Sequence, residues 1–179
     1  GITDSDHILI IVTDGKCSVS CDGEDYILDT GEAFFVPAGH YYERKPIDGK
    51  LCTMYYIHFS LCLDVMQYDP EMLSKELISI RQRIDNELID GDANLSFPSR
   101  IYIQSKTRFP KFDEVNRLLH GINLFSSRRQ LMCKLQSSIN LSSILSLISQ
   151  LTIDSIFINS DIHTNITIPS NLKRAIGYI

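Results

Sequence analysis

The sequence GEAFFVPAG, residues 31–39, places a glycine before a short apolar strand and a Pro-Ala-Gly turn after it. Gly31 opens the strand from a tight turn, and Pro37 fixes the backbone at the far end. Gly39 then supplies the positive φ that swings the next strand back. This spacing predicts two consecutive antiparallel strands joined by a tight turn.

Turn signals on both sides of this stretch divide the first sixty residues into short strands. Asp14-Gly15, Asp22-Gly23 and Asp48-Gly49 each separate two runs of strand-type sequence. We expect strands over residues 7–12, 16–21, 24–28, 33–36, 40–45 and 50–59. So many short strands in succession predict an antiparallel barrel or sandwich.

Beyond residue 60 the spacing of apolar residues changes from that of strands to that of helices. We expect a helix over residues 69–90, a short strand at 101–104, and helices over 112–125 and 128–151. The connection at residues 126–127 is so brief that the last two helices should form an antiparallel hairpin. The predicted fold class is α+β, mainly β: an antiparallel β-barrel followed by a helix hairpin.

These elements divide the chain into four parts. Residues 1–110 form the barrel with one inserted helix, 111–151 the hairpin, 152–169 a linker, and 170–179 the start of another helix. Leu172, Ile176 and Ile179 keep helical spacing up to the last residue. We therefore expect the natural protein to continue into a further domain.

The helix over 128–151 has more apolar surface than one contact with a barrel should absorb. It also contains six serines, which let two helix backbones approach closely. A solvated face and a self-association surface are both compatible with this composition. For self-association, the predicted dimerisation residues are Leu131, Leu135, Ile139 and Leu145.

Composition and charge narrow the function classes. The chain has 179 residues, 44% of them hydrophobic and 22% charged, which fits one globular domain. Its net charge of −5 opposes binding to a phosphate backbone, so these residues are not expected to bind nucleic acid themselves. We find no signal sequence and no apolar run of ~20 residues, and predict a cytoplasmic protein without membrane contact.

The sequence contains no motif that proposes a catalytic mechanism. A Gly-x-Ser-x-Gly elbow, a Walker-type phosphate loop and a His-Glu-x-x-His pair are all missing. The five cysteines have no Cys-x-x-Cys spacing, and we expect Cys17 and Cys21 to be small buried hydrophobes. The prediction is a protein that is not an enzyme.

Residues 31–39 have the skeleton of the second cupin motif, and the order of elements sharpens this resemblance. A barrel, the strand ending Tyr55-Tyr56-Ile57-His58-Phe59, a helix pair, a linker and the final LKRAIGYI together resemble the N-terminal half of AraC-type transcriptional regulators. The resemblance implies a cupin-like domain that binds a small effector, often a sugar, and forms a homodimer through its helices. It also implies that DNA is bound only by a C-terminal helix-turn-helix domain, whose first helix the residues 170–179 resemble.

Metal-binding cupins differ from this chain at the ligand positions. Their first motif carries histidines, whereas residues 15–25 have none, and the ligand position of the second motif is Tyr42. His40 lies two residues early, on the opposite face of its predicted strand. We therefore expect no metal and no cofactor. The alternative interpretation is a metal-dependent cupin enzyme, an isomerase or a dioxygenase.

Strand alternation indicates which side chains face the barrel interior. Arg44 shares a face with Tyr42, and Met54, Tyr56 and His58 share a face of the strand over 50–59. The likeness to arabinose-type pockets of the family adds Thr13. The predicted ligand-binding residues are therefore Thr13, Tyr42, Arg44, Met54, Tyr56 and His58. Alternatively, Arg44 is a surface charge, Met54 fills the core, and His58 is structural.

Overall fold

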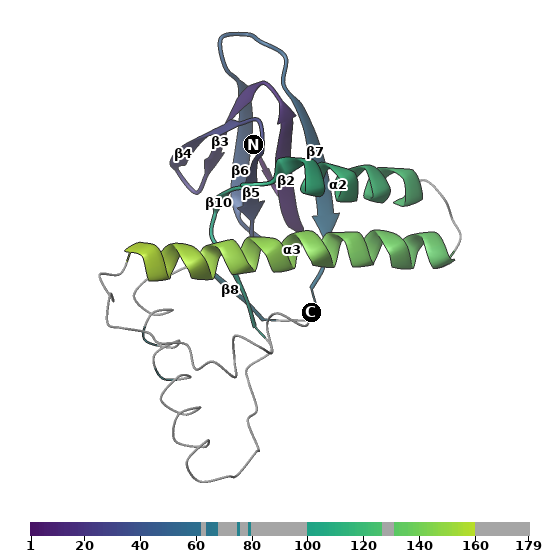
Figure 1. Cartoon of the computed structure of the whole chain (residues 1–179). Coiled ribbons are helices and arrows are strands. Elements are labelled where there is room, and N and C mark those ends of the chain that lie inside the picture. The colour runs from purple at the N-terminus through teal and green to yellow at the C-terminus, as the bar shows by residue number, and fades with distance from the viewer. Residues whose placement is uncertain (62–63, 68–74, 76–78, 80–99, 127–130, 160–179) are drawn as a thin grey trace.

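A computed structural model describes residues 1–61, 64–67, 75, 79, 100–126 and 131–159 (Figure 1). Its first strands are β1 (Ile2–Thr3), β2 (His7–Asp14), β3 (Lys16–Cys21), β4 (Glu24–Asp29), β5 (Glu32–Val36), β6 (Tyr41–Pro46) and β7 (Thr53–Phe59). They are followed by β8 (Asp64–Gln67), β9 (Arg100–Ile103), β10 (Lys106–Arg108), α2 (Phe112–Ser126) and α3 (Leu131–Asn159). The six strands predicted in the first sixty residues are all present.

Two four-stranded antiparallel sheets form a sandwich, in the orders β1-β6-β3-β4 and β10-β5-β2-β7. The hairpin between β3 and β4 turns at Asp22 and Gly23, whose φ angles of 49° and 90° are those of a tight turn. Gly39 has a φ of 82°, as the Pro-Ala-Gly spacing predicts, and its N–H donates to Asp4 O at 2.7 Å. The sequence signal and the observed turn therefore agree.

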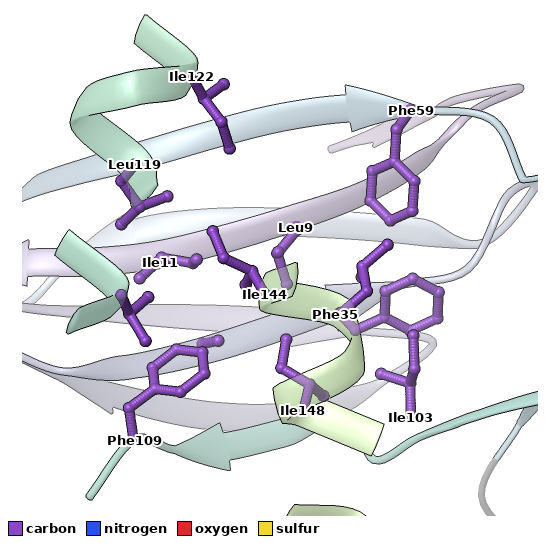
Figure 2. Packing of buried hydrophobic residues seen from close by; sticks show 13 residues of the cluster. Leu9, Ile11, Phe35, Phe59, Ile103, Phe109, Leu119, Ile122, Ile144 and Ile148 are labelled. Atoms are coloured by element: carbon purple, nitrogen blue, oxygen red, sulfur yellow. The ribbon is translucent and has the colours of Figure 1, made fainter. Parts of the chain in front are cut away.

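Strand β2 is buried on both faces, which explains its unbroken apolar run. Ile8, Ile10 and Val12 point between the two sheets, whereas Leu9 and Ile11 point toward the helices. All five are completely buried. Figure 2 shows the helix side of this core, where side chains of the sheet meet Leu119 and Ile122 of α2 and Ile144 and Ile148 of α3.

The helices α2 and α3 pack against each other beside the sandwich (Figure 1). Gly121 of α2 permits a close approach, because a Cβ at this position would lie 2.3 Å from Asn140 Nδ2. Asn140 is buried in α3 and donates to Leu118 O at 3.3 Å. The predicted hairpin is thus held by packing and by a hydrogen bond between the helices.

Helix α3 extends eight residues beyond the predicted end at Leu151, into the part assigned to the linker. Two hydroxyls of α3 accept hydrogen bonds from backbone N–H groups at β9: Tyr102 N donates to Ser149 Oγ at 3.3 Å, and Gln104 N donates to Thr152 Oγ1 at 3.2 Å. Some of the predicted serine stripe therefore caps backbone groups instead of facing solvent. Most of the predicted helix 69–90, the rest of the linker and residues 170–179 lie outside the described residues.

Glu32 begins β5, directly after the glycine of the GEAFFVPAG stretch, and only 5% of it is exposed. Its carboxylate accepts from Asp29 N at 2.8 Å. Lys106 Nζ lies 2.9 Å and Arg108 Nη1 3.5 Å from the same carboxylate. The buried charge is thereby paired with two cations of β10, which joins the late strand to the centre of the sandwich.

Candidate functional site

Five of the six predicted ligand-binding side chains meet where β6 faces β7. The Arg44 guanidinium lies 4.5 Å from the centre of the Tyr56 ring, and its Nη1 donates to Met54 Sδ at 3.3 Å. The Tyr56 ring lies 6.3 Å from the ring of Tyr42 and 4.8 Å from that of His58. We call these five residues the β6–β7 cluster. Strand alternation from the sequence therefore identified one spatial group.

The cluster combines a buried aromatic base with a more accessible rim. Tyr42 is 3% exposed, and this burial raises the pKa of its hydroxyl. The side chain of His58 is 41% exposed, and Arg44 is exposed as well. A guanidinium over an aromatic face is a favourable contact that still leaves N–H donors free to bind oxygen.

The N-terminal segment brings to the cluster one residue that the sequence analysis missed, Asp4. Its Oδ2 lies 3.2 Å from His58 Nδ1, while its Oδ1 accepts from Asp6 N at 3.0 Å. Strand β1 pairs with β6, with Ile2 opposite Tyr42. The segment therefore lies along the rim of the cluster. No local signal marks Asp4, because its role depends on contacts with residues far along the chain.

The space beneath the cluster is packed, which corrects the expectation of a polar hollow. Ile10, Val12, Leu28 and Phe34 lie between the sheets and are at most 1% exposed. Polar and aromatic residues thus line the edge of an apolar interior. Alternation identifies the face on which each side chain lies, but it does not indicate how completely neighbouring side chains fill the space.

Thr13 does not join the cluster, and this is a second correction. The pairing of β2 with β7 shifts register between Val12 and Asp14. Thr13 Oγ1 donates to Thr53 O at 3.1 Å, and Thr13 lines a groove shared with α2. Its odd position in β2 places it with Leu9 and Ile11, on the helix side of the sheet.

Asp4, Asp6 and His58 form a group whose ligand atoms lie within 4.8 Å of one another, close enough to share a cation. Each already has a partner, because Asp4 contacts His58 and Ser60 Oγ donates to Asp6 Oδ1 at 2.8 Å. The group is also more accessible than a buried metal site would be. We therefore describe it as a polar rim.

The buried thiol nearest the cluster is suited to packing. Cys17 is 2% exposed, and burial, followed by the neighbouring Cys52 thiol, raises the pKa of Cys17 to about 11. It therefore stays protonated at neutral pH, in the form that neither binds metal nor acts as a nucleophile. The expectation of a small buried hydrophobe holds for Cys17, whereas Cys21 is half-buried.

Three of the four predicted dimerisation residues form an exposed apolar strip on α3. Leu131 is 80% exposed, Leu135 51% and Ile139 48%, with Met132 beside them at 71%. Leu145 is only 2% exposed and packs in the core between α3 and the sheet. We therefore remove Leu145 from the predicted surface, since the chain itself covers it. Leu131, Met132, Leu135 and Ile139 are called the α3 strip below.

The length and composition of Leu131–Ser155 alone would allow this part of α3 to cross a membrane. Its mean hydropathy reaches 1.2, and 22% of the window is buried inside the protein. However, Ile144 and Ile148 pack against the sandwich. Packing therefore explains the apolar residues on the side of α3 that meets the sandwich, whereas the exposed α3 strip is not covered by the protomer.

Two antiparallel sheets followed by a helix pair define a cupin-like fold. Residues 2–74 match the family model of the AraC-like ligand binding domain. This match confirms the resemblance to the N-terminal, effector-binding domain of AraC-type regulators, and it supports a ligand-sensing role for the matched segment. No curated protein matches the chain in sequence.

Proposed function

We propose that this chain is the effector-sensing and dimerisation part of an AraC-type transcriptional regulator in the cytoplasm, without catalytic activity. It would control a C-terminal helix-turn-helix domain that binds DNA. The observation that carries the proposal is the β6–β7 cluster at the edge of a sandwich that matches a ligand-binding family. The cluster would hold the effector.

The chemistry of the cluster favours a small polar effector, such as a carbohydrate. Tyrosine rings cover apolar C–H surface, while guanidinium and imidazole N–H groups bind hydroxyl oxygens. Because the space beneath is packed, the effector would enter from the rim and displace the Arg44 guanidinium from the Tyr56 ring. Arg44 would then donate hydrogen bonds to the effector.

Two contacts of β7 would provide a physical route from the effector to the rest of the protein. His58 contacts Asp4 in the N-terminal segment. Tyr55 of β7 points the other way, and its hydroxyl lies 3.3 Å from His120 Nδ1 in α2. A small shift of β7 would therefore reach both the N-terminal segment and the helix hairpin. Allosteric couplings of this kind are typically about 1–3 kcal/mol.

The dimer would form through the α3 strip, with a second copy of this chain as its partner. Four large apolar side chains exposed within nine residues of one helix are unusual for a surface that stays in water. Their spacing at i, i+1, i+4 and i+8 keeps them on one side of α3. The strip faces away from the residues that pack on the sheet, so dimerisation leaves the sandwich intact.

The proposal is tested with a panel of pentoses, hexoses and polar metabolites, using the thermal shift of the protein. Arg44→Ala and Tyr56→Ala should each abolish the shift given by an active metabolite without changing the oligomeric mass. Lys45→Ala, a neighbouring exposed position that pairs with Glu43, should keep the shift. Elemental analysis separates the alternative, because a cupin isomerase or dioxygenase would copurify with stoichiometric metal.

Two results would contradict the proposal. The first is the absence of a thermal shift with every metabolite in the panel, which would indicate a domain that only dimerises and binds no effector. The second is an undiminished shift in both Arg44→Ala and Tyr56→Ala, which would place the effector elsewhere.

A further inference from the structure

A second polar surface lies on the opposite face of β7, between this strand and α2, which lie side by side in Figure 1. It is a groove of about 560 Å³. The side chains that determine its chemistry are Thr13, Thr53, Tyr55, Asn116, His120 and Asn123. Met54 and Tyr56 complete the lining from β7.

Helix α2 contributes three of the polar side chains of the groove, and these are regularly spaced along the helix. Asn116, His120 and Asn123 are spaced at i, i+4 and i+7 on α2, so they fall on one face of the helix. Asn116 is half-buried, whereas His120 and Asn123 are exposed, so the stripe lies at the edge of the contact between α2 and the sheet. These side chains therefore line the accessible side of the groove.

Several hydrogen-bonding groups in the groove remain available. Asn116 is half-buried, and its side-chain amide has no hydrogen-bond partner among the described residues. His120 uses Nδ1 for Tyr55, which leaves its Nε2 available. Strand β7 pairs only with β2 among the described strands, so its outer edge also presents backbone donors and acceptors.

The lining selects a chemical class of ligand. None of the lining residues is an aspartate, glutamate, lysine or arginine. Hydroxyls and amides each donate and accept hydrogen bonds, which is also what the hydroxyls of a polyol or sugar do. An anionic or cationic ligand would lose hydration here without gaining an opposite charge.

We propose that the groove between β7 and α2 is a second ligand site, which binds an uncharged polyhydroxylated molecule such as a free sugar. It shares Met54 and Tyr56 with the β6–β7 cluster, but it differs from the cluster in the three side chains that α2 supplies and in having no guanidinium in its lining. Its occupant would bridge the sandwich and α2. The site also gives a role to Thr13, which the sequence analysis selected and the cluster does not use.

The test is NMR titration of the isotope-labelled protein with xylose, glucose and myo-inositol as uncharged probes. Glucuronate and glucosamine serve as charged counterparts of similar size. We expect the uncharged probes to shift amide signals of residues 53–55 and 116–123, and the charged probes to bind at least about tenfold more weakly. Asn116→Leu and Thr53→Val should each weaken uncharged binding by about two- to tenfold, the range expected when one hydrogen bond is lost.

Glu114→Gln is the matched control, because Glu114 is an exposed residue of α2 outside the groove. Because Arg44 contacts Met54 and Tyr56, which also line the groove, the helix variant Asn116→Leu is the one that separates this site from the proposed effector site. The proposal is overturned if the uncharged probes shift no groove signals, or shift only those around Arg44 and His58. It is equally overturned if Asn116→Leu and Thr53→Val both bind as the unaltered protein does.

Discussion

Replacing Leu135 with glutamate should dissociate the proposed dimer while leaving the protomer folded. Leu135 lies in the middle of the α3 strip and is 51% exposed, so about half of its side chain is available to a partner. Fully burying a leucine is worth about 1.5–3 kcal/mol, which leaves about 1 kcal/mol for this half. A two-fold dimer contains the residue twice, so its apolar contribution is about 2 kcal/mol, or about 30-fold in the dissociation constant.

Glutamate adds a second effect to the loss of apolar contact. Near the two-fold axis of a symmetric interface, two carboxylates would face each other and lose hydration together. We therefore expect Leu135→Glu to weaken the dimer by more than the 30-fold estimated above, and Leu135→Ala to weaken it by up to that factor. The protomer should be little affected, because the glutamate can extend into water from a half-exposed position.

Sedimentation velocity over a range of concentrations measures the change directly, and circular dichroism checks that the fold is kept. The protomer mass is 20.4 kDa, and the unaltered chain should sediment as twice that mass. Ser146→Glu is the charge control: it is exposed on the same helix but lies about 10 Å beyond Ile139, the last residue of the strip. An unaltered chain that is monomeric throughout, or a Leu135→Glu variant that stays dimeric, would refute the reasoning.

Three further predictions concern stability. Glu32→Gln should lower the free energy of unfolding by about 1–2 kcal/mol, because the two cations of β10 lose a buried partner yet remain hydrated; an unchanged melting temperature would contradict this. Burial lowers the pKa of His7 below 6.5, and its Nδ1 accepts a hydrogen bond from Ala38 N at 3.0 Å. The unfolded chain therefore binds more protons than the folded chain at acidic pH. The free energy of unfolding should rise with pH up to about 6.5 and then level off. Urea unfolding at pH 5 to 8 should show this slope, and His7→Phe should remove it. Gly121→Ala should destabilise the protein by displacing the Asn140 amide. In an Asn140→Ala background the same substitution should stabilise the protein by up to about 1 kcal/mol, because alanine has the higher helix propensity. An effect of the same sign in both backgrounds would contradict the close approach of the two helices.

Local signals were sufficient to predict the strands of the sandwich. Glycine and aspartate turns punctuate the first sixty residues, and the observed strands begin and end within a few residues of the predicted bounds. Strands β1, β8 and β10 have only two to four residues each, too few for any periodicity, and were missed. Helix α3 is longer than predicted because the hydroxyls of Thr152 and Ser155 donate to carbonyls of the helix itself. These residues therefore continue the helix instead of ending it.

The grouping of side chains in the β6–β7 cluster was predictable wherever it depends on which face of a strand a residue occupies. Tyr42 and Arg44 share a face of β6, and Met54, Tyr56 and His58 share a face of β7, so alternation was enough to group them. Contacts between elements distant in sequence were not predictable. The contact between Asp4 and His58 is one example. The burial of Leu145 is another, because α3 has apolar residues on all its sides and their periodicity could not show which side meets the sheet.

Strand β7 is the element on which the proposed sensing depends. It is an edge strand, with only β2 as partner among the described strands, so a displacement disturbs one hydrogen-bonded ladder instead of two. Tyr56 and His58 on one face contact the cluster and the N-terminal segment, while Tyr55 on the other contacts α2. Because successive side chains of a strand cannot move independently of their shared backbone, a ligand on either face changes the position of the groups on the other. Two ligands that favour the same position of β7 would therefore bind cooperatively, and each would strengthen the other by the same factor.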